Sequence, residues 1–65
     1  MTKEELHPIG THVRVKNNYP RYRYDSGKVR EITNYIEYFN GWGYQLNNDK
    51  QCIYINSDFQ QILKP

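Results

Sequence analysis

The segment NYIEYFNGWGYQL, Asn34 to Leu46, predicts the β-hairpin around which the rest of the fold is arranged. Its centre is Asn40-Gly41, a dipeptide that favours two-residue hairpin loops because both central positions of a type I′ turn need positive φ. Aromatic and β-branched residues dominate the flanking stretches, as is usual in strands. With Asn40-Gly41 as the loop, the expected cross-strand pairs are Phe39 with Trp42, Glu37 with Tyr44 and Tyr35 with Leu46.

The Phe39–Trp42 pair beside this loop has two interpretations. Facing aromatic side chains across a closing pair contribute about 0.5–1.5 kcal/mol to folding. An exposed Trp at a tight turn is also typical of an interface hot spot, because Trp, Tyr and Arg dominate interface energetics. On the second interpretation Trp42 is a candidate partner-binding residue.

Strand patterns also precede the hairpin. THVRVK, residues 11–16, alternates apolar and polar side chains, which predicts that Val13 and Val15 are buried. GKVREIT follows after a long polar loop and offers Val29 and Ile32 as buried residues. These two lie three positions apart, so we expect a β-bulge between them.

After the hairpin, the β-branched stretch QCIYI, residues 51–55, predicts another strand. NSDFQQ, residues 56–61, predicts a single 3-10 turn in which Ser57 or Asp58 caps exposed N–H groups and Phe59 enters the core. ILKP then ends the chain as a short strand.

This order of elements resembles the SH3-like small barrel of bacterial and phage domains. The resemblance is carried by GTHVRVK, GKVREI, GYQL and IYINSDFQQIL and covers residues 9–63. It implies an all-β fold, a five-stranded SH3-like small barrel with a long loop between strands one and two and a 3-10 turn before the last strand. We therefore expect residues 1–8 to form an N-terminal extension and residues 9–65 to form the barrel.

The composition limits the size and class of the protein. Its 65 residues form at most one domain, whose core stabilises the fold by about 3–5 kcal/mol. A hydrophobic fraction of 37% and a mean hydropathy of −1.02 lean towards disorder. An aromatic fraction of 15% and a net charge of only +2 favour a folded domain with a tyrosine-rich surface instead.

The cysteine count indicates a compartment. Cys52 is the only cysteine, so an intramolecular disulfide is excluded and a reducing, cytoplasmic setting is the simpler interpretation. Together with His7 and His12 it falls short of the four ligands of a structural zinc site. The sequence has neither the apolar core of a signal peptide nor the roughly 20 apolar residues of a membrane helix. We expect a cytoplasmic protein with no metal, no cofactor and no membrane partner.

The stretch NNYPRYRYDSG, Asn17 to Gly27, carries the clearest candidate binding site. Aromatic and cationic side chains alternate in it: Tyr19, Arg21, Tyr22, Arg23 and Tyr24. Tyrosine rings stack on bases and arginines contact phosphates in single-stranded nucleic-acid grooves, and the same residues build protein-binding surfaces. The alternative is a β-ribbon with the tyrosines packed on one face and the arginines in solvent.

Further cations flank this loop. Lys16, Lys28 and Arg30 join Arg21 and Arg23, so five of the nine Lys and Arg residues lie between positions 16 and 30. The acids in or beside that window are Asp25 and Glu31, which leaves a local excess of +3, five cations minus two acids. A one-sided basic patch is typical of proteins that bind nucleic acid or an acidic protein surface.

The sequence shows no Gly-rich phosphate loop, nucleophile elbow or metal-ligand spacing. No histidine lies near Cys52 in the sequence to activate it. We therefore expect a small non-catalytic binding module, with no small-molecule substrate, that contacts nucleic acid through the loop and the basic patch. The alternative is a protein-binding accessory or inhibitor protein, bacterial or phage, that uses the same surface. In either case we expect a monomer or a weak homo-oligomer.

Overall fold

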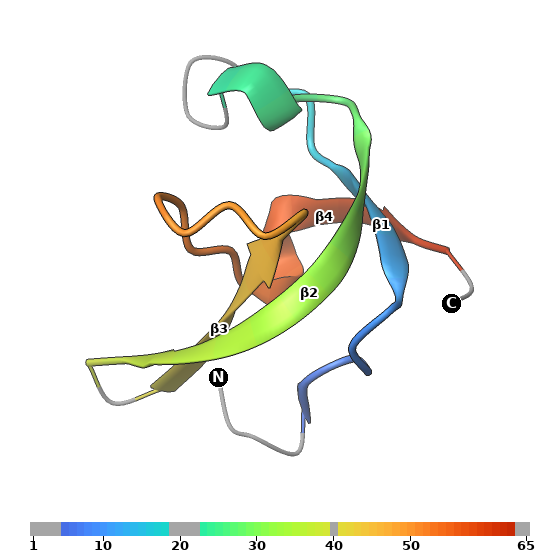
Figure 1. The fold of residues 1–65 in the computed structure, drawn as a ribbon. Helices are drawn as coiled ribbons and strands as arrows, with labels where there is room; N and C mark the ends of the chain where they lie inside the picture. Colours follow the sequence, from blue (N-terminus) through green and yellow to red (C-terminus); the bar gives the residue numbers. More distant parts are fainter. Residues whose placement is uncertain (1–4, 19–22, 40, 64–65) are drawn as a thin grey trace.

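The computed structural model describes residues 5–18, 23–39 and 41–63. Within these ranges the chain is all-β, as expected, and contains no α-helix. Its elements are β1 (His12–Val15), η2 (Arg23–Asp25), β2 (Val29–Tyr38), β3 (Gly41–Leu46), η3 (Asn56–Asp58) and β4 (Phe59–Ile62), where η2 and η3 are 3-10 turns. The strands form an antiparallel, four-stranded sheet in the order β3-β2-β1-β4 (Figure 1).

β2 is a ten-residue strand that joins the two halves of this sheet. Its beginning pairs with β1, and the part from Ile32 onwards pairs with β3; Figure 1 shows how the strand curves between them. The register shifts between Ile32 and Asn34, so the irregularity follows Ile32 instead of preceding it as expected. Val29 lies opposite Arg14 on the outer face and is 36% exposed, so the prediction that Val29 is buried was wrong.

The core is formed by side chains from every strand. The buried hydrophobic residues are Val13, Val15, Ile32, Tyr44, Leu46, Tyr54 and Phe59. The predictions for both valines of β1, for Ile32 and for Phe59 are therefore confirmed. Two of the seven are tyrosines, whose hydroxyls need hydrogen-bond partners because an unpaired buried polar group is costly. Those partners come from outside the sheet and fix the segments around it.

The β2–β3 hairpin is present, but its register differs from the expected one. The observed pairs include Tyr38 with Gly41, Glu37 with Trp42 and Tyr35 with Tyr44. The loop therefore begins at Phe39, whose φ is +48°, and the expected pairing of Phe39 with Trp42 was wrong. The expected register would have set the Glu37 carboxylate against the fully buried ring of Tyr44, where an unpaired charge is costly. In the observed register Glu37 stays exposed.

The described residues form four strands where the sequence predicted five. Residues 51–55 contribute an isolated bridge between Tyr44 and Tyr54, with N···O distances of 2.7 and 3.0 Å. The turn η3 begins at Asn56, directly afterwards, so pairing cannot continue along β3. β3 and β4 are the edges of the sheet among the described residues, and the sheet is not closed into a barrel.

The predicted 3-10 turn before the last strand is present as η3, but it ends at Asp58. Residues 59–61, which the sequence assigned to the turn, belong to β4, so the last strand begins earlier than expected. Asp58 caps it, because its Oδ2 accepts a hydrogen bond from the Ile55 N–H at 2.9 Å. Lys16 N donates to Asp58 O at 3.0 Å, which aligns the start of β4 with the end of β1. Phe59 follows and packs into the core.

Residues 5–8, assigned to an extension by the sequence, lie against the sheet. The Tyr35 hydroxyl donates to His7 O at 2.6 Å, and His7 N donates to the Tyr44 hydroxyl at 2.8 Å. The Tyr44 hydroxyl in turn donates to Asn56 Oδ1 at 2.6 Å. Leu6 packs against the core. No helix among the residues that the structure describes has the length and apolar character needed to cross a membrane.

Candidate functional site

Neighbouring strands close the base of the long loop between β1 and β2. Val15 N donates to Lys28 O, and Gly27 N donates to Val15 O, both at 3.0 Å. Gly27 has a φ of +72°, a conformation that glycine adopts without strain. The chain therefore leaves β1 at Lys16 and returns at Lys28 next to it, and both lysines are exposed.

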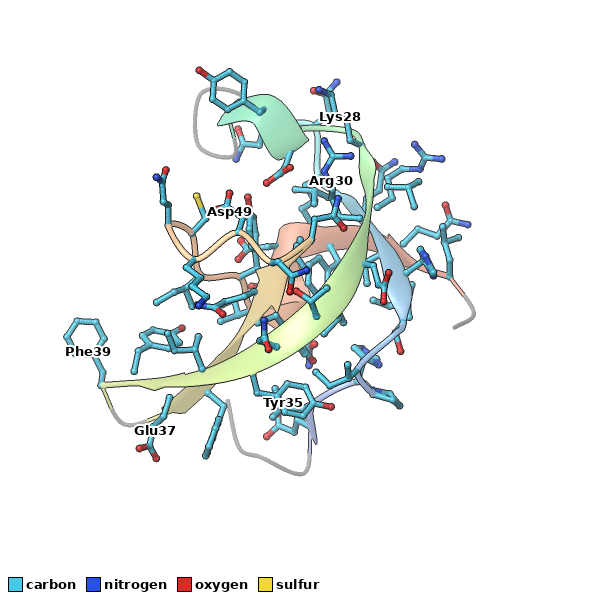
Figure 2. The ribbon with its side chains drawn as sticks, viewed as in Figure 1. Lys28, Arg30, Tyr35, Glu37, Phe39 and Asp49 are labelled. Carbon is cyan, nitrogen blue, oxygen red and sulfur yellow. The ribbon has the colours of Figure 1, made fainter. Side chains whose placement is uncertain are left out.

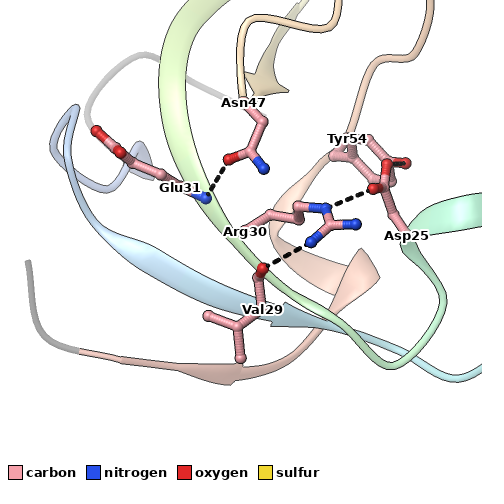
Figure 3. Close-up of polar contacts among 6 residues, drawn as sticks. All are labelled: Asp25, Val29, Arg30, Glu31, Asn47 and Tyr54. Atoms are coloured by element: carbon pink, nitrogen blue, oxygen red, sulfur yellow. Dashed lines mark hydrogen bonds and ion pairs between the residues drawn. The ribbon is translucent and has the colours of Figure 1, made fainter.

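Asp25, at the end of η2, ties the returning half of the loop to the body of the protein (Figure 3). Its Oδ1 accepts a hydrogen bond from Arg30 Nε at 2.7 Å, and its Oδ2 accepts one from the Tyr54 hydroxyl at 2.7 Å. Its backbone carbonyl accepts from Lys28 N at 3.0 Å. These contacts connect η2, β2 and the segment before η3, and they hold η2 in one position.

The Asp25 carboxylate and the Arg30 guanidinium form an ion pair of low exposure. Their side chains are 16% and 24% exposed, so the pair is partly withdrawn from water. Burial raises the pKa of the Tyr54 phenol above its ordinary value, and the hydrogen bond to Asp25 adds to that rise. Tyr54 therefore stays protonated and serves as the donor to the carboxylate.

This ion pair determines which charges remain on the surface. The one acid of the loop is neutralised by Arg30, whose Nη1 also donates to Val29 O at 3.1 Å. Lys16 and Lys28 form no ion pair within the described part of the chain. Arg14 Nη1 donates to Gly27 O at 3.0 Å, which brings a third cation to the same place without neutralising it. We call Arg14, Lys16 and Lys28 the loop-base cations.

The structure separates the predicted site residues into groups. Tyr24 lies on η2 and is 81% exposed, and Lys16 and Lys28 lie at the loop base, where Figure 2 labels Lys28. Arg30 is committed to Asp25 and is less available to a partner than expected. Arg23 begins η2. Tyr19, Arg21 and Tyr22 lie outside the described residues.

Trp42 lies away from this group. It pairs with Glu37 near the tip of the β2–β3 hairpin, whereas the long loop enters the other end of β2 (Figure 1). The side chain is half-buried instead of fully exposed. Trp42, a candidate partner-binding residue from the sequence, is therefore separated from the long loop by the length of β2.

Sequence reasoning missed two contributors to the site. Arg14 was not considered, although its position between two inward-facing valines marks it as an outward cation beside the loop. The Asp25–Tyr54 hydrogen bond joins residues 29 positions apart. No local pattern signals such a contact, because it depends on where the segment before η3 crosses β3.

Among the described residues no group of three or more His, Cys, Asp or Glu side chains is placed to hold a metal ion. Comparison of the chain with protein-family models, with curated proteins and with solved structures found no match.

Proposed function

We propose that this chain is a small non-catalytic binding module that contacts single-stranded nucleic acid through the long loop and the loop-base cations. The observation that carries the proposal is that the Asp25 carboxylate accepts hydrogen bonds from Arg30 and Tyr54 within the protein. Because the loop's acid is paired internally, Lys16 and Lys28 at its base stay exposed and form no ion pair with the residues that the structure describes. Phosphates are bound by such cations, with release of counterions.

The exposed aromatic side chain supports the same proposal. Tyr24 is 81% exposed on a turn that Asp25 holds in place. This exposure disfavours the alternative in which the loop tyrosines pack as one face of a β-ribbon. A phenol ring presented beside cations is the arrangement on which bases stack, at about 1–3 kcal/mol per base. Tyr19 and Tyr22 are included in the proposed contact surface on the basis of the sequence alone.

We also propose that the fold is an SH3-like barrel in which one strand is reduced to a bridge. Support comes from the order of the elements: a long loop separates β1 from β2, and η3 directly precedes β4, which returns to pair with β1. The Tyr44–Tyr54 bridge stands where the fourth of five strands is expected. β2 pairs with β1 at its beginning and with β3 further along, so it curves from one half of the sheet to the other. A small barrel requires a strand that is curved in this way.

The experiment that tests the proposed function is a titration of labelled single- and double-stranded oligonucleotides with the purified protein, followed by fluorescence anisotropy at about 50 and 200 mM salt. We expect preferential binding of the single strand, with an affinity that falls as salt rises. An absence of binding to either oligonucleotide at the lower salt concentration would refute nucleic-acid binding. An acidic protein surface would then be the ligand to test on the same loop.

A further inference from the structure

An exposed aromatic side chain lies near each end of β2, and the charged residues at the two ends have opposite signs. At the end that follows Tyr38, Phe39 is 96% exposed, and Figure 2 shows it projecting from the hairpin tip, with the Glu37 side chain on the other side of the ribbon. At the end that precedes Val29, Tyr24 is exposed on η2, which a hydrogen bond from Lys28 N to Asp25 O connects to the loop base. An acidic residue therefore accompanies the exposed ring at one end of the molecule, and cations accompany the exposed ring at the other end.

Phe39 is costly for the isolated chain in two ways. Its φ of +48° is in the left-handed region, which is unfavourable for a bulky residue. Its ring meets Tyr38 edge-on, with ring centroids 5.7 Å apart, yet remains almost completely in water. Backbone strain combined with an exposed aromatic side chain is a feature that clusters at binding sites.

Glu37 gives the hairpin tip its charge. The carboxylate is exposed and forms no ion pair within the described part of the chain. It is also the only charged residue between positions 32 and 46. A partner for this tip therefore needs an aromatic or apolar contact for the ring of Phe39 and a cation for Glu37.

We propose that the hairpin tip of one molecule docks on the loop base of a second copy, in a head-to-tail contact. In this arrangement Phe39 packs against Tyr24 of the second copy, and Glu37 lies near its Lys16 and Lys28. Aromatic pairs and cation–π contacts supply the short-range attraction, and the opposite charges orient the encounter. The contact joins different surfaces of the two copies, so it produces rings or open chains instead of closed two-fold dimers.

The contact is small, so association should be weak and sensitive to salt. An interface below the standard size is typical of weak, transient association. Nucleic acid that occupies the loop-base cations should compete with it. The proposal does not depend on nucleic-acid binding, since neither Glu37 nor Phe39 belongs to the proposed nucleic-acid surface.

The test is sedimentation velocity over a protein concentration range of about 10 µM to 1 mM, at about 25 and 300 mM salt. At low salt the average mass should rise above the 7.9 kDa of one chain as concentration increases, and at high salt it should fall back. Glu37→Lys and Phe39→Gly should each weaken association at least about tenfold. Glu31→Lys, which changes an exposed acid on the outer face of the sheet, is the matched control and should associate as the unchanged protein does.

A mixing experiment makes the test independent of how well any one variant folds. Lys16→Glu/Lys28→Glu and Glu37→Lys should each remain monomeric alone, and a mixture of the folded variants should associate through the reversed charges. The proposal is overturned if the unchanged protein stays at 7.9 kDa throughout the low-salt series. It is equally overturned if Glu37→Lys associates as strongly as Glu31→Lys, or if the mixture fails to associate.

Discussion

The hydroxyl of Tyr54 donates a 2.7 Å hydrogen bond to Asp25 Oδ2, across 29 positions of sequence. The same carboxylate accepts a hydrogen bond from Arg30. One side chain of the loop thus holds η2 against β2 and against the segment that precedes η3. It also withdraws the loop's negative charge from the surface, which is the feature on which the proposed function depends.

Replacement of Tyr54 by Phe tests this hydrogen bond directly. The ring and its packing are retained, while a partly buried charged acceptor loses its donor, so the free energy of unfolding should fall by about 2 kcal/mol. Urea denaturation monitored by circular dichroism measures this change. Tyr24→Phe is the matched control: its hydroxyl belongs to an 81% exposed side chain, and its loss should change the unfolding free energy by less than about 0.5 kcal/mol.

Removal of the Asp25 carboxylate should cost more. Asp25→Ala removes the acceptor of the hydrogen bonds from Arg30 Nε and the Tyr54 hydroxyl in a partly buried setting, for an expected loss of about 2–4 kcal/mol. Glu31→Ala removes an exposed acid from the adjacent strand and should be nearly neutral. Equal effects of the two substitutions in urea denaturation would contradict the structural role of Asp25.

Alkaline pH should destabilise the fold. Burial raises the pKa of both Tyr44 and Tyr54 in the folded protein, whereas each titrates near its ordinary value of about 10 in the unfolded chain. Above pH 10 the unfolded chain therefore releases protons that the folded chain keeps. The stability contributed by each phenol is fully present below about pH 10 and is lost as pH rises towards its folded pKa, by at most about 1.4 kcal/mol per pH unit.

Urea denaturation at about pH 9 and pH 11 measures this dependence. In Tyr54→Phe one of the two phenols is gone, so its stability should decline less steeply than that of the unchanged protein. If both proteins lost stability with the same slope between these pH values, the raised pKa of Tyr54 would have no thermodynamic consequence, and the prediction would be wrong.

Phe39→Gly should stabilise the monomer. Glycine adopts the positive φ of this position without strain, and the 96% exposed ring contributes little burial that could be lost. An increase of about 0.5–1 kcal/mol in the unfolding free energy is expected, partly offset by the larger entropy of glycine in the unfolded chain. Thermal denaturation at low protein concentration gives the measurement, with Phe39→Ala, which keeps the strain, as the control. A lower melting temperature for the Gly variant than for the Ala variant would show that the backbone strain at this position is not relieved.

The sequence predicts this fold where neighbouring residues decide the structure. Alternation in THVRVK identified the buried valines of β1, and NSDFQQ predicted a 3-10 turn capped by Ser57 or Asp58, of which Asp58 is the cap in η3. The hairpin was also correctly located, but its register was not. The turn preference of Asn40-Gly41 predicted a loop made of these two residues. In the structure the buried Tyr44 pairs with Tyr35 instead, and the register follows this pair. Long-range packing outweighed a local turn preference.

The candidate site was predictable in composition but not in arrangement. The cluster of cations around the long loop is visible in the sequence, and Lys16, Lys28 and Tyr24 are exposed as a contact surface requires. The ion pair of Arg30 with Asp25 was not predictable, because it depends on the approach of Asp25 and Tyr54 in space. Trp42 was a candidate binding residue by residue type alone, and the length of β2 separates it from the long loop.

The central claim is that the loop-base cations bind phosphates, and the salt dependence of oligonucleotide binding tests it most directly. The measurement compares Lys16→Ala/Lys28→Ala with the unchanged protein and with Lys50→Ala, an exposed lysine in the turn after β3. Each phosphate contact to a single strand contributes about 0.7 to the slope of log affinity against log salt. We expect the double variant to lose about 1.4 of this slope while Lys50→Ala keeps it. Equal slopes for the three proteins would contradict the claim.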